Sequence, residues 1–334
     1  MIDPAVFETM FQGWIDVSGC TTVAITPLTQ DNTAPLSKLE NPSSIAPNYL
    51  INSWDLRCAP LKAFPFAKSL IAAAFPFHSL PELPAFPVSE FAPFNGIIAG
   101  YADRQDYHIT GREAMLSLAE AIAQTSNSPV KYEICIDTAP LAERNIAEIS
   151  GLGKRGYNDC ILCKNEASGC YLTFMVLNIE LPTICPEEIS PPCHECKRCI
   201  QSCPSSVLGS DRFKLEKCVS FLSMEKRGEL SPDEAALLGE NIFGCSQCTA
   251  TCPGTNMPDD IKIDLEWLLM SSTGEVRKVI KRSPAEYAGI TLLRRNALYV
   301  LNSRKNEKCN ELIKRFRKRC GSEFLNAISA NMTD

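Results

Sequence analysis

The chain is organised around two cysteine-rich stretches, CHECKRCIQSCP (residues 193–204) and CSQCTATCP (residues 245–253). The first has the spacing C-x2-C-x2-C-x3-C-P, in which three closely spaced thiolates hold one 4Fe–4S cluster and the fourth cysteine holds a second cluster. The second stretch repeats only the last three cysteines of that spacing, and Cys218 lies between the stretches, where it can supply the missing ligand. The spacing therefore predicts two 4Fe–4S clusters.

The eight cysteines divide into two sets of four ligands. The first cluster is predicted to bind Cys193, Cys196, Cys199 and Cys252, and the second to bind Cys203, Cys218, Cys245 and Cys248. Zinc sites would require paired C-x2-C knuckles rather than a triple run followed by Cys-Pro. A disulfide scaffold is typical of short secreted chains, whereas this chain has 334 residues and begins with MIDPAVFETMFQGW, which lacks the segments of a signal peptide. Iron–sulfur clusters are favoured over both alternatives.

The composition is that of a globular protein. Hydrophobic residues make up 45% of the chain, and a chain of this length buries about three quarters of its unfolded surface. Length predicts two or three domains. No segment reaches the ~18 apolar residues of a membrane span. Seventeen cysteines are compatible with a reducing cytoplasm, where they persist as thiols and cluster ligands.

Nine cysteines remain outside the two ligand sets. They are Cys20, Cys58, Cys135, Cys160, Cys163, Cys170, Cys185, Cys309 and Cys320. The pair Cys160-x2-Cys163 has the spacing of a metal or redox pair, but no second knuckle accompanies it. We therefore expect the nine to be small buried hydrophobic residues, which is how free cysteine commonly packs.

Charge is unevenly distributed along the chain. The net charge is −6, yet the stretch 277–319 carries fourteen Lys or Arg residues against three Glu, a local net charge of +11. Such asymmetry favours a polyanionic partner docking on the C-terminal part. A solvated helix face that balances an acidic body explains the same pattern, and both interpretations stay open.

The N-terminal half alternates strand and helix patterns. Residues 1–60 predict a short amphipathic start followed by a loop. Apolar runs predict strands at Ser69–Phe77 and 171–178, and the alternation of apolar residues predicts a third at Lys131–Ile136. The spacing of apolar residues predicts a helix at 111–125. The second strand leads into Asp137, and we expect a helix from Pro140 to Ser150. Asp137 would then lie at the carboxyl end of a strand, where ligand-facing residues cluster in α/β folds.

The remaining stretches predict one flexible turn and a helical C-terminal part. Gly151-Leu152-Gly153-Lys154-Arg155-Gly156 reads as a turn that would let a cofactor approach the backbone. Ser231-Pro232-Asp233-Glu234 is a capping box that begins a helix ending at Gly239. After Pro258 we expect helices, the first with Ile261 and Leu265 on its apolar face, and later ones at Ile290–Leu301 and 307–320.

Several motifs together resemble the epoxyqueuosine reductase family over roughly residues 65–302. They are YADRQDYH (Tyr101–His108), DTAPLAER (Asp137–Arg144), Gly151-Leu152-Gly153 followed by Gly156, the whole eight-cysteine pattern, and LRRNALYVLN (Leu293–Asn302). The chain departs from the family at Lys154-Arg155-Gly156-Tyr157, where the family has an aromatic-aliphatic pair and a lysine around the glycine.

The resemblance implies a mixed fold, α+β or α/β, in three domains. A nitroreductase-like cobalamin and catalytic domain is expected at residues 1–185, a ferredoxin-like two-cluster module at 186–258, and a basic helical-repeat tail at 259–334. It also implies a cobalamin-dependent reductase that converts epoxyqueuosine to queuosine in tRNA, with electrons delivered through the two clusters. The implied partners are the tRNA anticodon arm and a reduced ferredoxin or flavodoxin-type donor, with the protein a monomer away from membranes.

The resemblance also assigns site residues. Asp137 matches the general acid that protonates the departing oxygen, and burial beside the corrinoid would keep such an acid protonated. The implied lining of the cobalamin and substrate pocket is Tyr101, Asp106, Tyr107, His108, Arg144, Gly153 and Gly156. Without the resemblance, Asp137 reads as a helix cap, His108 as a structural histidine, and Arg144 as a surface ion-pair partner.

Two other functions stay open. A paralogue with the same cofactors would act on a small organic substrate and would not bind tRNA. A non-catalytic electron carrier, or an activator of a corrinoid protein, would hold the iron–sulfur clusters but no corrinoid.

Overall fold

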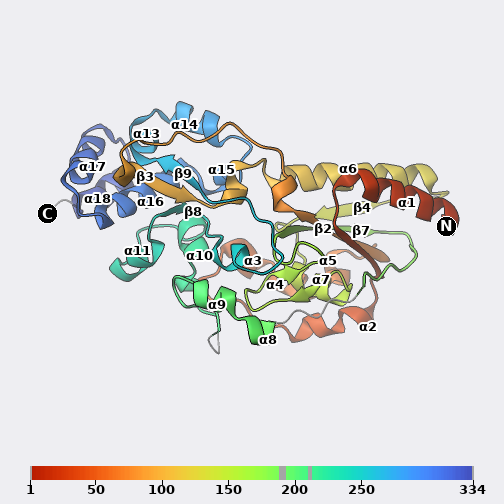
Figure 1. Ribbon diagram of the computed structural model, residues 1–334. Helices are drawn as coiled ribbons and strands as arrows, with labels where there is room; N and C mark the ends of the chain where they lie inside the picture. The colour runs from red at the N-terminus through yellow and green to blue at the C-terminus, as the bar shows by residue number, and fades with distance from the viewer. Residues whose placement is uncertain (1, 188–192, 210–212, 333–334) are drawn as a thin grey trace. The chain divides into compact units, whose positions relative to one another are not determined.

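The computed structural model describes residues 2–187, 193–209 and 213–332, which form two compact units (Figure 1). Unit 1 comprises Met1–Leu80, Tyr107–Gln201 and Cys248–Met257. Unit 2 comprises Pro81–Asp106, Ser202–Gln247 and Pro258–Asp334. The chain therefore passes between the units several times, and the two-cluster segment predicted at 186–258 contributes to both.

Unit 1 is built on a four-stranded sheet in the order β1-β2-β7-β4. The strands are β1 (Thr22–Pro27), β2 (Ser69–Pro76), β7 (Cys170–Leu177) and β4 (Tyr132–Cys135), and each neighbouring pair is antiparallel. The three strands predicted from the sequence are confirmed. The expectation of a loop throughout the later part of residues 1–60 is wrong, because β1 lies there and forms the edge of the sheet.

Helices cover one face of this sheet. Side chains alternate between the two faces of a strand, so Ile71, Ala73 and Phe75 of β2 pack against α1 (Pro4–Ser18) and α6 (Tyr107–Thr125). The indole Nε1 of Trp14 in α1 donates a hydrogen bond of 3.0 Å to the carbonyl of Ala114 in α6. The helix predicted at 111–125 is confirmed, and it begins four residues earlier, at Tyr107.

Loops and short helices cover the other face. Leu70, Ala72 and Ala74 of β2 pack there against Leu141 and Ile146, among others. Every residue of β2 is buried, which explains why its sequence is uniformly apolar rather than alternating. The shorter helices of unit 1 are α2 (Gln30–Thr33), α3 (Asn48–Asn52), α4 (Trp54–Arg57), α5 (Pro60–Ala63), α7 (Glu143–Ile149) and α8 (Cys193–Cys196).

The helix after Asp137 begins later than its sequence predicts. Helix α7 starts at Glu143, not at Pro140. The backbone N–H of Leu141 donates to the carbonyl of Ala139 at 2.8 Å, and Nη1 of Arg57 donates to the carbonyl of Leu141 at 3.0 Å. These contacts hold residues 139–141 in a tight turn, so the expected position of Pro140 in the first helical turn is wrong.

The glycine-rich stretch is an ordered hairpin, which corrects the prediction of a flexible turn. Strand β5 (Lys154–Arg155) pairs with β6 (Ile161–Leu162) in antiparallel register. A Cβ atom at Gly153 would lie 2.4 Å from the carbonyl oxygen of Leu162, so glycine is required there by the close approach of the hairpin backbone.

Unit 2 contains a three-stranded sheet in the order β8-β3-β9. Strand β3 (Asn95–Ile98) pairs in parallel with β8 (Asn241–Phe243) and antiparallel with β9 (Ile261–Asp264). The prediction of helix at Ile261 is wrong: Ile261 and Ile263 follow the two-residue period of a strand, and Ile263 is fully buried. Helix begins at Leu265.

Unit 2 also contains eight helices among the described residues. They are α10 (Val219–Met224), α11 (Pro232–Leu238), α13 (Leu265–Met270), α14 (Thr273–Ile280), α15 (Ala285–Ala288), α16 (Ile290–Ser303), α17 (Glu307–Arg319) and α18 (Glu323–Ala330). Of these, α10, α13 and α16 contact the sheet. Two four- to five-residue helices, α9 (Arg198–Ser202) and α12 (Gln247–Ala250), lie in the cysteine-rich stretches. The helices predicted near 290–301 and 307–320 are confirmed, as is the buried position of Cys309 on α17.

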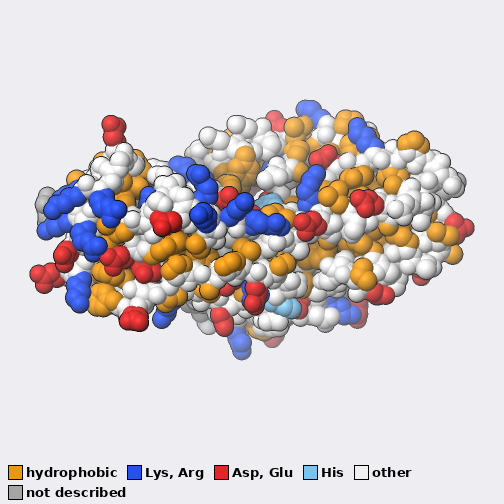
Figure 2. All heavy atoms as spheres, turned by 90° about the horizontal axis from the view of Figure 1, so that it is seen from above, with side chains coloured by type: hydrophobic (Ala, Val, Ile, Leu, Met, Phe, Trp, Pro, Cys, Tyr) orange, Lys and Arg blue, Asp and Glu red, His pale blue; other side chains and the backbone are white. Residues whose placement is uncertain are grey.

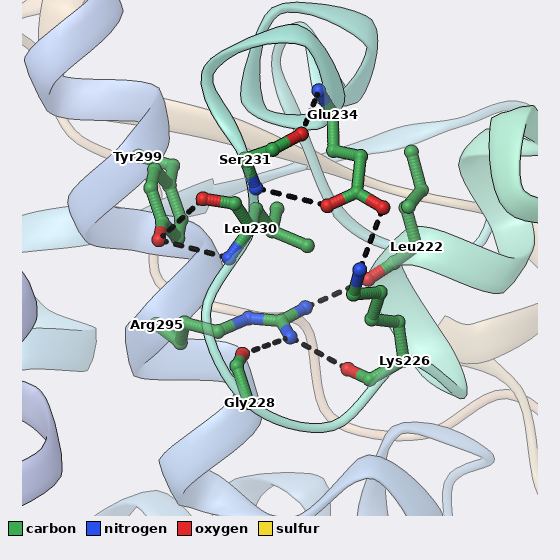
Figure 3. Close-up of polar contacts among 8 residues, drawn as sticks. All are labelled: Leu222, Lys226, Gly228, Leu230, Ser231, Glu234, Arg295 and Tyr299. Carbon is green, nitrogen blue, oxygen red and sulfur yellow. Dashed lines mark hydrogen bonds and ion pairs between the residues drawn. The ribbon is translucent and has the colours of Figure 1, made fainter.

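Helix α16 is fixed to the segment after Cys218 by a buried arginine (Figure 3). Arg295 is fully buried and donates to the carbonyl oxygens of Leu222, Lys226 and Gly228 at 2.6–2.8 Å. Burial lowers the pKa of Arg295 to about 10. The motif LRRNALYVLN therefore contributes to the packing of unit 2.

The predicted capping box is confirmed in the same region. The N–H of Glu234 donates to Ser231 Oγ at 3.3 Å, and the N–H of Ser231 donates to Glu234 Oε2 at 2.9 Å. Helix α11 ends at Gly239, as predicted. The hydroxyl of Tyr299 on α16 also contacts the backbone N–H and carbonyl of Leu230, just before the box (Figure 3).

The basic stretch 277–319 has two kinds of side chain. Arg294, Arg295 and Arg304 donate to backbone carbonyls and so hold unit 2 together. Others are exposed on the C-terminal helices, where Lys and Arg gather in the space-filling view (Figure 2). These include Lys278, Lys281, Lys308, Lys314, Lys318 and Arg319. Part of the local charge of +11 is thus structural. Over the described residues, no helix is both long and apolar enough to cross a bilayer.

Candidate functional site

Asp137 lies in a strained turn at the end of β4. Its φ angle is +55°, a region that residues other than glycine seldom adopt. The N–H of Thr138 donates to the carbonyl of Ile136 at 2.5 Å, which closes a three-residue γ-turn with Asp137 at its centre. Strain of this kind persists where the surroundings enforce it, and it clusters at functional sites. Asp137 follows the end of a strand, as expected, but β4 pairs antiparallel with β7. The site is therefore not the edge of a parallel sheet at which ligands bind in α/β folds.

Two aromatic side chains at the start of α6 contact the carboxyl group of Asp137. The hydroxyl of Tyr107 donates a hydrogen bond to Asp137 Oδ2. The Nε2 atom of His108 lies 3.5 Å from the same oxygen, and the two rings stack with centroids 4.3 Å apart. The Asp137 side chain keeps 52% of its surface exposed, so a ligand can reach its carboxyl group.

A buried arginine donates hydrogen bonds to the backbone of this turn. Arg57 donates from Nη2 to the carbonyl of Asp137 and from Nη1 to that of Leu141, both at 3.0 Å. Its Nε donates to Ser53 Oγ at 2.9 Å. Only 5% of Arg57 is exposed. The sequence analysis missed this residue, because it lies 80 positions from Asp137 in a stretch without a motif.

A second acidic residue accompanies Asp137. Glu143, the first residue of α7, interacts with both the side chain and the backbone of Asp137. Burial raises the pKa of Glu143 well above its ordinary value, and the nearby carboxyl group of Asp137 raises it further. Glu143 is part of the motif DTAPLAER, but its position in the sequence did not reveal that it would meet Asp137.

The other predicted pocket residues lie apart. Arg144 forms an ion pair with Asp159 in the β5–β6 hairpin, and Arg155 pairs with Asp159 and Glu148 at 2.9 and 3.1 Å. Gly153 and Gly156 belong to the same hairpin. In unit 2, the hydroxyl of Tyr101 contacts Met224 Sδ at 3.2 Å, and the backbone N–H of Asp106 donates to the carbonyl of Arg282 at 2.7 Å. Their places in a cobalamin pocket remain predictions.

The four cysteines predicted for the first cluster surround one cavity in unit 1. The cavity measures about 310 Å³, and Cys193, Cys196, Cys199 and Cys252 all line it. The remaining lining includes Tyr157, Asn158 and Leu162 of the β5–β6 hairpin. Over the described residues, no three Cys, His, Asp or Glu side chains gather tightly enough to hold a single metal ion. Four thiols around a cavity are a donor set that suits an iron–sulfur cluster.

Polar contacts fix the segment that carries Cys252. Asn158 Nδ2 donates to the carbonyl of Cys248 at 3.1 Å. The backbone N–H of Ser168 donates to Thr255 Oγ1 at 3.1 Å, and its hydroxyl donates to the carbonyl of Thr249 at 3.3 Å. The hairpin and the following turn thus position one wall of the cavity, a role that the cysteine spacing alone did not indicate.

Three of the four cysteines predicted for the second cluster lie together in unit 2. Cys245 interacts with both Cys218 and Cys203. Burial opposes ionisation of Cys203, but donors from Ser205 and the backbone N–H groups of Val207 and Leu208 outweigh it and lower the pKa of this thiol. The fourth predicted ligand, Cys248, belongs to unit 1, and its assignment to this cluster remains a prediction.

Two family models match the chain. The model described as "Epoxyqueuosine reductase QueG, DUF1730" matches residues 57–138, and the model described as "4Fe-4S double cluster binding domain" matches residues 192–255. The first match runs from Arg57 to just beyond Asp137 and includes Tyr107 and His108. The second contains all eight cysteines of the two predicted ligand sets.

Curated relatives carry the same description. The chain is 31% identical over 199 residues to the epoxyqueuosine reductase of Aliivibrio fischeri, which covers 59% of this chain and 52% of that protein. It is 29% identical over 258 residues to the epoxyqueuosine reductase of Staphylococcus aureus, which covers 74% of this chain and 66% of that protein. The alignment to the first of these relatives spans about half of its length.

Solved structures share the fold over nearly the whole chain. A crystal structure of epoxyqueuosine reductase with an epoxyqueuosine-modified tRNA-Tyr stem loop matches with a TM-score of 0.80 at 21% identity, covering 98% of this chain and 89% of that one. Epoxyqueuosine reductase from Streptococcus thermophilus matches with a TM-score of 0.75 at 21% identity, covering 96% and 88%. The mixed α and β fold predicted from the sequence is thereby confirmed.

Proposed function

We infer that this chain is a member of the epoxyqueuosine reductase family and reduces epoxyqueuosine to queuosine in tRNA, with electrons delivered through two 4Fe–4S clusters. The observation that carries the inference is the group formed by Tyr107, His108 and Asp137, which lies inside the matched reductase domain and presents a half-exposed carboxyl group. The eight-cysteine double-cluster segment supplies the route for electrons.

The cysteine residues are assigned to the clusters as the spacing predicts. Cluster 1 would be held by Cys193, Cys196, Cys199 and Cys252, which share one cavity. Cluster 2 would be held by Cys203, Cys218, Cys245 and Cys248. Clusters of this kind transfer single electrons, whereas removing an epoxide oxygen as water takes two electrons and two protons.

Cobalamin, the cofactor of this family, would supply a cobalt centre that accumulates electrons for the two-electron step. The carboxyl group of Asp137 is accessible to a ligand, and its backbone carbonyl accepts a hydrogen bond from the buried Arg57. On the strength of the family motifs, we assign the unit 1 residues Tyr107, His108, Arg144, Gly153 and Gly156 to the lining of this site. The family motifs also assign Tyr101 and Asp106, which belong to unit 2, to cofactor or substrate binding.

Asp137 would act as the general acid at the departing oxygen. A positioned acid of this kind contributes about 10²–10⁴-fold to a rate. Tyr107 orients Oδ2 by its hydrogen bond, and His108 flanks the same atom. These two contacts, together with the positive φ angle of Asp137, fix the orientation of its carboxyl group.

We assign the partners from the family and from surface charge. The exposed Lys and Arg side chains of the C-terminal helices would contact phosphates of the tRNA anticodon arm. A reduced ferredoxin or flavodoxin-type protein in the cytoplasm would supply electrons, and the chain would act as a monomer. We keep the domain assignment of residues 1–185, 186–258 and 259–334 as a functional division.

Anaerobic reconstitution tests this function. Protein loaded with both clusters and with cobalamin is reduced and incubated with epoxyqueuosine-containing tRNA, which is then digested to nucleosides for mass spectrometry. Queuosine is expected from wild type, and at least about 100-fold less from Asp137→Asn. Loaded protein that binds no tRNA at low salt and forms no queuosine would favour a small organic substrate. Protein that holds clusters but no corrinoid would favour an electron carrier or activator.

A further inference from the structure

The carboxyl group of Glu143 is buried beside that of Asp137. Glu143 follows Asp137 by six residues, and the tight turn between them brings the two side chains together. The Oε1 atom of Glu143 is buried without a hydrogen-bond partner among the described residues. An ionised carboxylate with a buried, unpaired oxygen is costly, because charged groups lose more on desolvation than neutral ones. A neutral carboxylic acid at this position avoids most of that cost.

The charges that face Glu143 do not compensate for this burial. Asp137 carries the same sign as an ionised Glu143 and disfavours its charge. Arg57 is the nearby cation, but its Nη atoms are directed at the backbone carbonyls of Asp137 and Leu141. The Cys135 thiol lies on the β4 side, and Arg144 is paired with Asp159. Two carboxyl groups in such a place tend to share one proton.

The chemistry of the proposed function calls for a second proton. The epoxide oxygen leaves as water, so two protons are consumed for each oxygen removed. Asp137 accepts a hydrogen bond from Tyr107 at Oδ2, so that oxygen acts as an acceptor, and a donor must protonate the carboxyl group again after each transfer. Glu143 is within reach of Asp137 and is sheltered from bulk water at Oε1.

We propose that Glu143 is a positioning residue that is neutral at rest, donates its carboxyl proton in a hydrogen bond to Asp137, and transfers that proton to Asp137 as Asp137 protonates the departing oxygen. The O–H bond of Glu143 breaks as an O–H bond forms on Asp137, and that bond of Asp137 breaks in turn as the departing oxygen gains the proton. Solvent later returns a proton to Glu143. The delivery of the proton to an epoxide rests on the proposed function, whereas the shared proton itself does not.

An ordinary structural role makes a different prediction. An acidic residue in the first turn of a helix is stabilised in its charged form by the helix dipole. Glu143 would then be ionised at neutral pH, as an ordinary glutamate with a pKa of about 4.3 is. The protonation state of Glu143 therefore separates the two roles.

Infrared spectroscopy reads this state without any turnover. The full chain with both clusters, but without cobalamin or RNA, is prepared with glutamate labelled with ¹³C at the side-chain carboxyl, as wild type, Glu143→Gln and Glu120→Gln. Glu120 is exposed on α6 and serves as the matched control. We expect the band of a protonated carboxylic acid to persist at near-neutral pH in wild type and in Glu120→Gln, and to be absent from Glu143→Gln.

The variant Asp137→Asn supplies a second measurement that needs no change at Glu143. Removal of the neighbouring negative charge should move the titration of Glu143 to lower pH, because Asp137 is one of the causes of its raised pKa. The proposal is overturned if Glu143 titrates together with the exposed glutamates in wild type, or if its titration is unchanged in Asp137→Asn. Both results can be obtained even if Glu143→Gln fails to fold.

The activity assay adds the functional consequence. In single turnover of loaded enzyme, Glu143→Gln should lose at least about tenfold in rate and change the pH profile, because glutamine cannot return a proton. An unchanged profile in Glu143→Gln, with a changed one in His108→Gln, would assign the proton to His108 instead and overturn the proposal. Queuosine formation with an ionised Glu143 would reject the shared proton alone, whereas a protonated Glu143 in an enzyme that forms no queuosine would reject only the proposed function.

Discussion

The hydroxyl of Tyr107 donates a hydrogen bond to Oδ2 of Asp137, which lies 30 residues further along the chain. The bond joins the first residue of α6 to the turn after β4, two elements that pack on the same sheet. It fixes the orientation of a carboxyl group whose backbone is already constrained by a positive φ angle. Tyr107 on α6 thus holds the side chain of Asp137, and Arg57 on α4 holds its backbone carbonyl.

Replacing Tyr107 with phenylalanine should therefore slow the proposed reaction. A hydrogen bond to a charged group contributes about 1.5–3 kcal/mol, so Tyr107→Phe should lower the single-turnover rate about 10- to 100-fold, with little change in tRNA affinity. Nucleoside mass spectrometry after a timed reaction measures the rate. Tyr132→Phe, on β4 of the same sheet, is the control. A Tyr107→Phe enzyme with the wild-type rate would remove Tyr107 from the site.

The long apolar elements and the cysteine ligands were predictable because each depends on local pattern. Strand β2 has an unbroken apolar run, and the capping box of α11 is a four-residue signal. The turn around Asp137 was not predictable in the same way. Its conformation depends on Arg57, 80 residues away, which also binds the carbonyl of Leu141, an acceptor that a helix beginning at Pro140 would have used.

The same reasoning explains the site residues that the sequence did not reveal. Glu143 reads as an ordinary acidic residue at a helix start, and only the folded turn shows that its Oε1 is buried next to Asp137. Strand β9 was mistaken for helix because Ile261, Leu265 and Leu268 fit a helical spacing. Pairing with β3 decided the outcome, a long-range contact that local periodicity does not contain.

Serine substitution at Cys199 should remove one cluster. Cys199 lines the cavity of unit 1 with three other predicted ligands, and serine is a poor replacement for a thiolate ligand of iron. Iron content should fall from about eight to about four atoms per chain, since each cluster holds four. Cys163→Ala is the control, because Cys163 lines the same cavity without belonging to either ligand set. Equal iron in wild type and Cys199→Ser would contradict the assignment.

The nine cysteines outside the ligand sets should differ widely in reactivity. The expected burial is confirmed for Cys135, Cys163 and Cys309, whereas five of the others are half-buried and Cys185 is exposed. Burial raises the pKa of Cys20 to about 12, and only the thiolate is alkylated. A thiol with a pKa near 8.5 has about 1,000-fold more thiolate at pH 8 than one near 12.

Alkylation with iodoacetamide at pH 8 tests this difference. Peptide mass spectrometry of the folded, cluster-loaded protein should show Cys185 modified early and Cys20 modified far more slowly. Guanidinium unfolding should bring the two rates close together, because the raised pKa of Cys20 results from burial. Similar rates in the folded protein would show that Cys20 is accessible and ionises normally.

Replacing Arg295 should destabilise unit 2. Its guanidinium group donates hydrogen bonds to the carbonyl oxygens of Leu222, Lys226 and Gly228. Methionine would leave these acceptors unpaired. Leaving a buried hydrogen-bond acceptor unpaired costs about 1–3 kcal/mol, so the loss should be at least of that size. Urea unfolding followed by circular dichroism under anaerobic conditions should show this loss for Arg295→Met. The control Arg319→Met, at an exposed position on α17, should change the free energy of unfolding by less than about 0.5 kcal/mol. Equal stability of the two variants would mean that packing on α16, rather than the carbonyl contacts, holds the segment after Cys218.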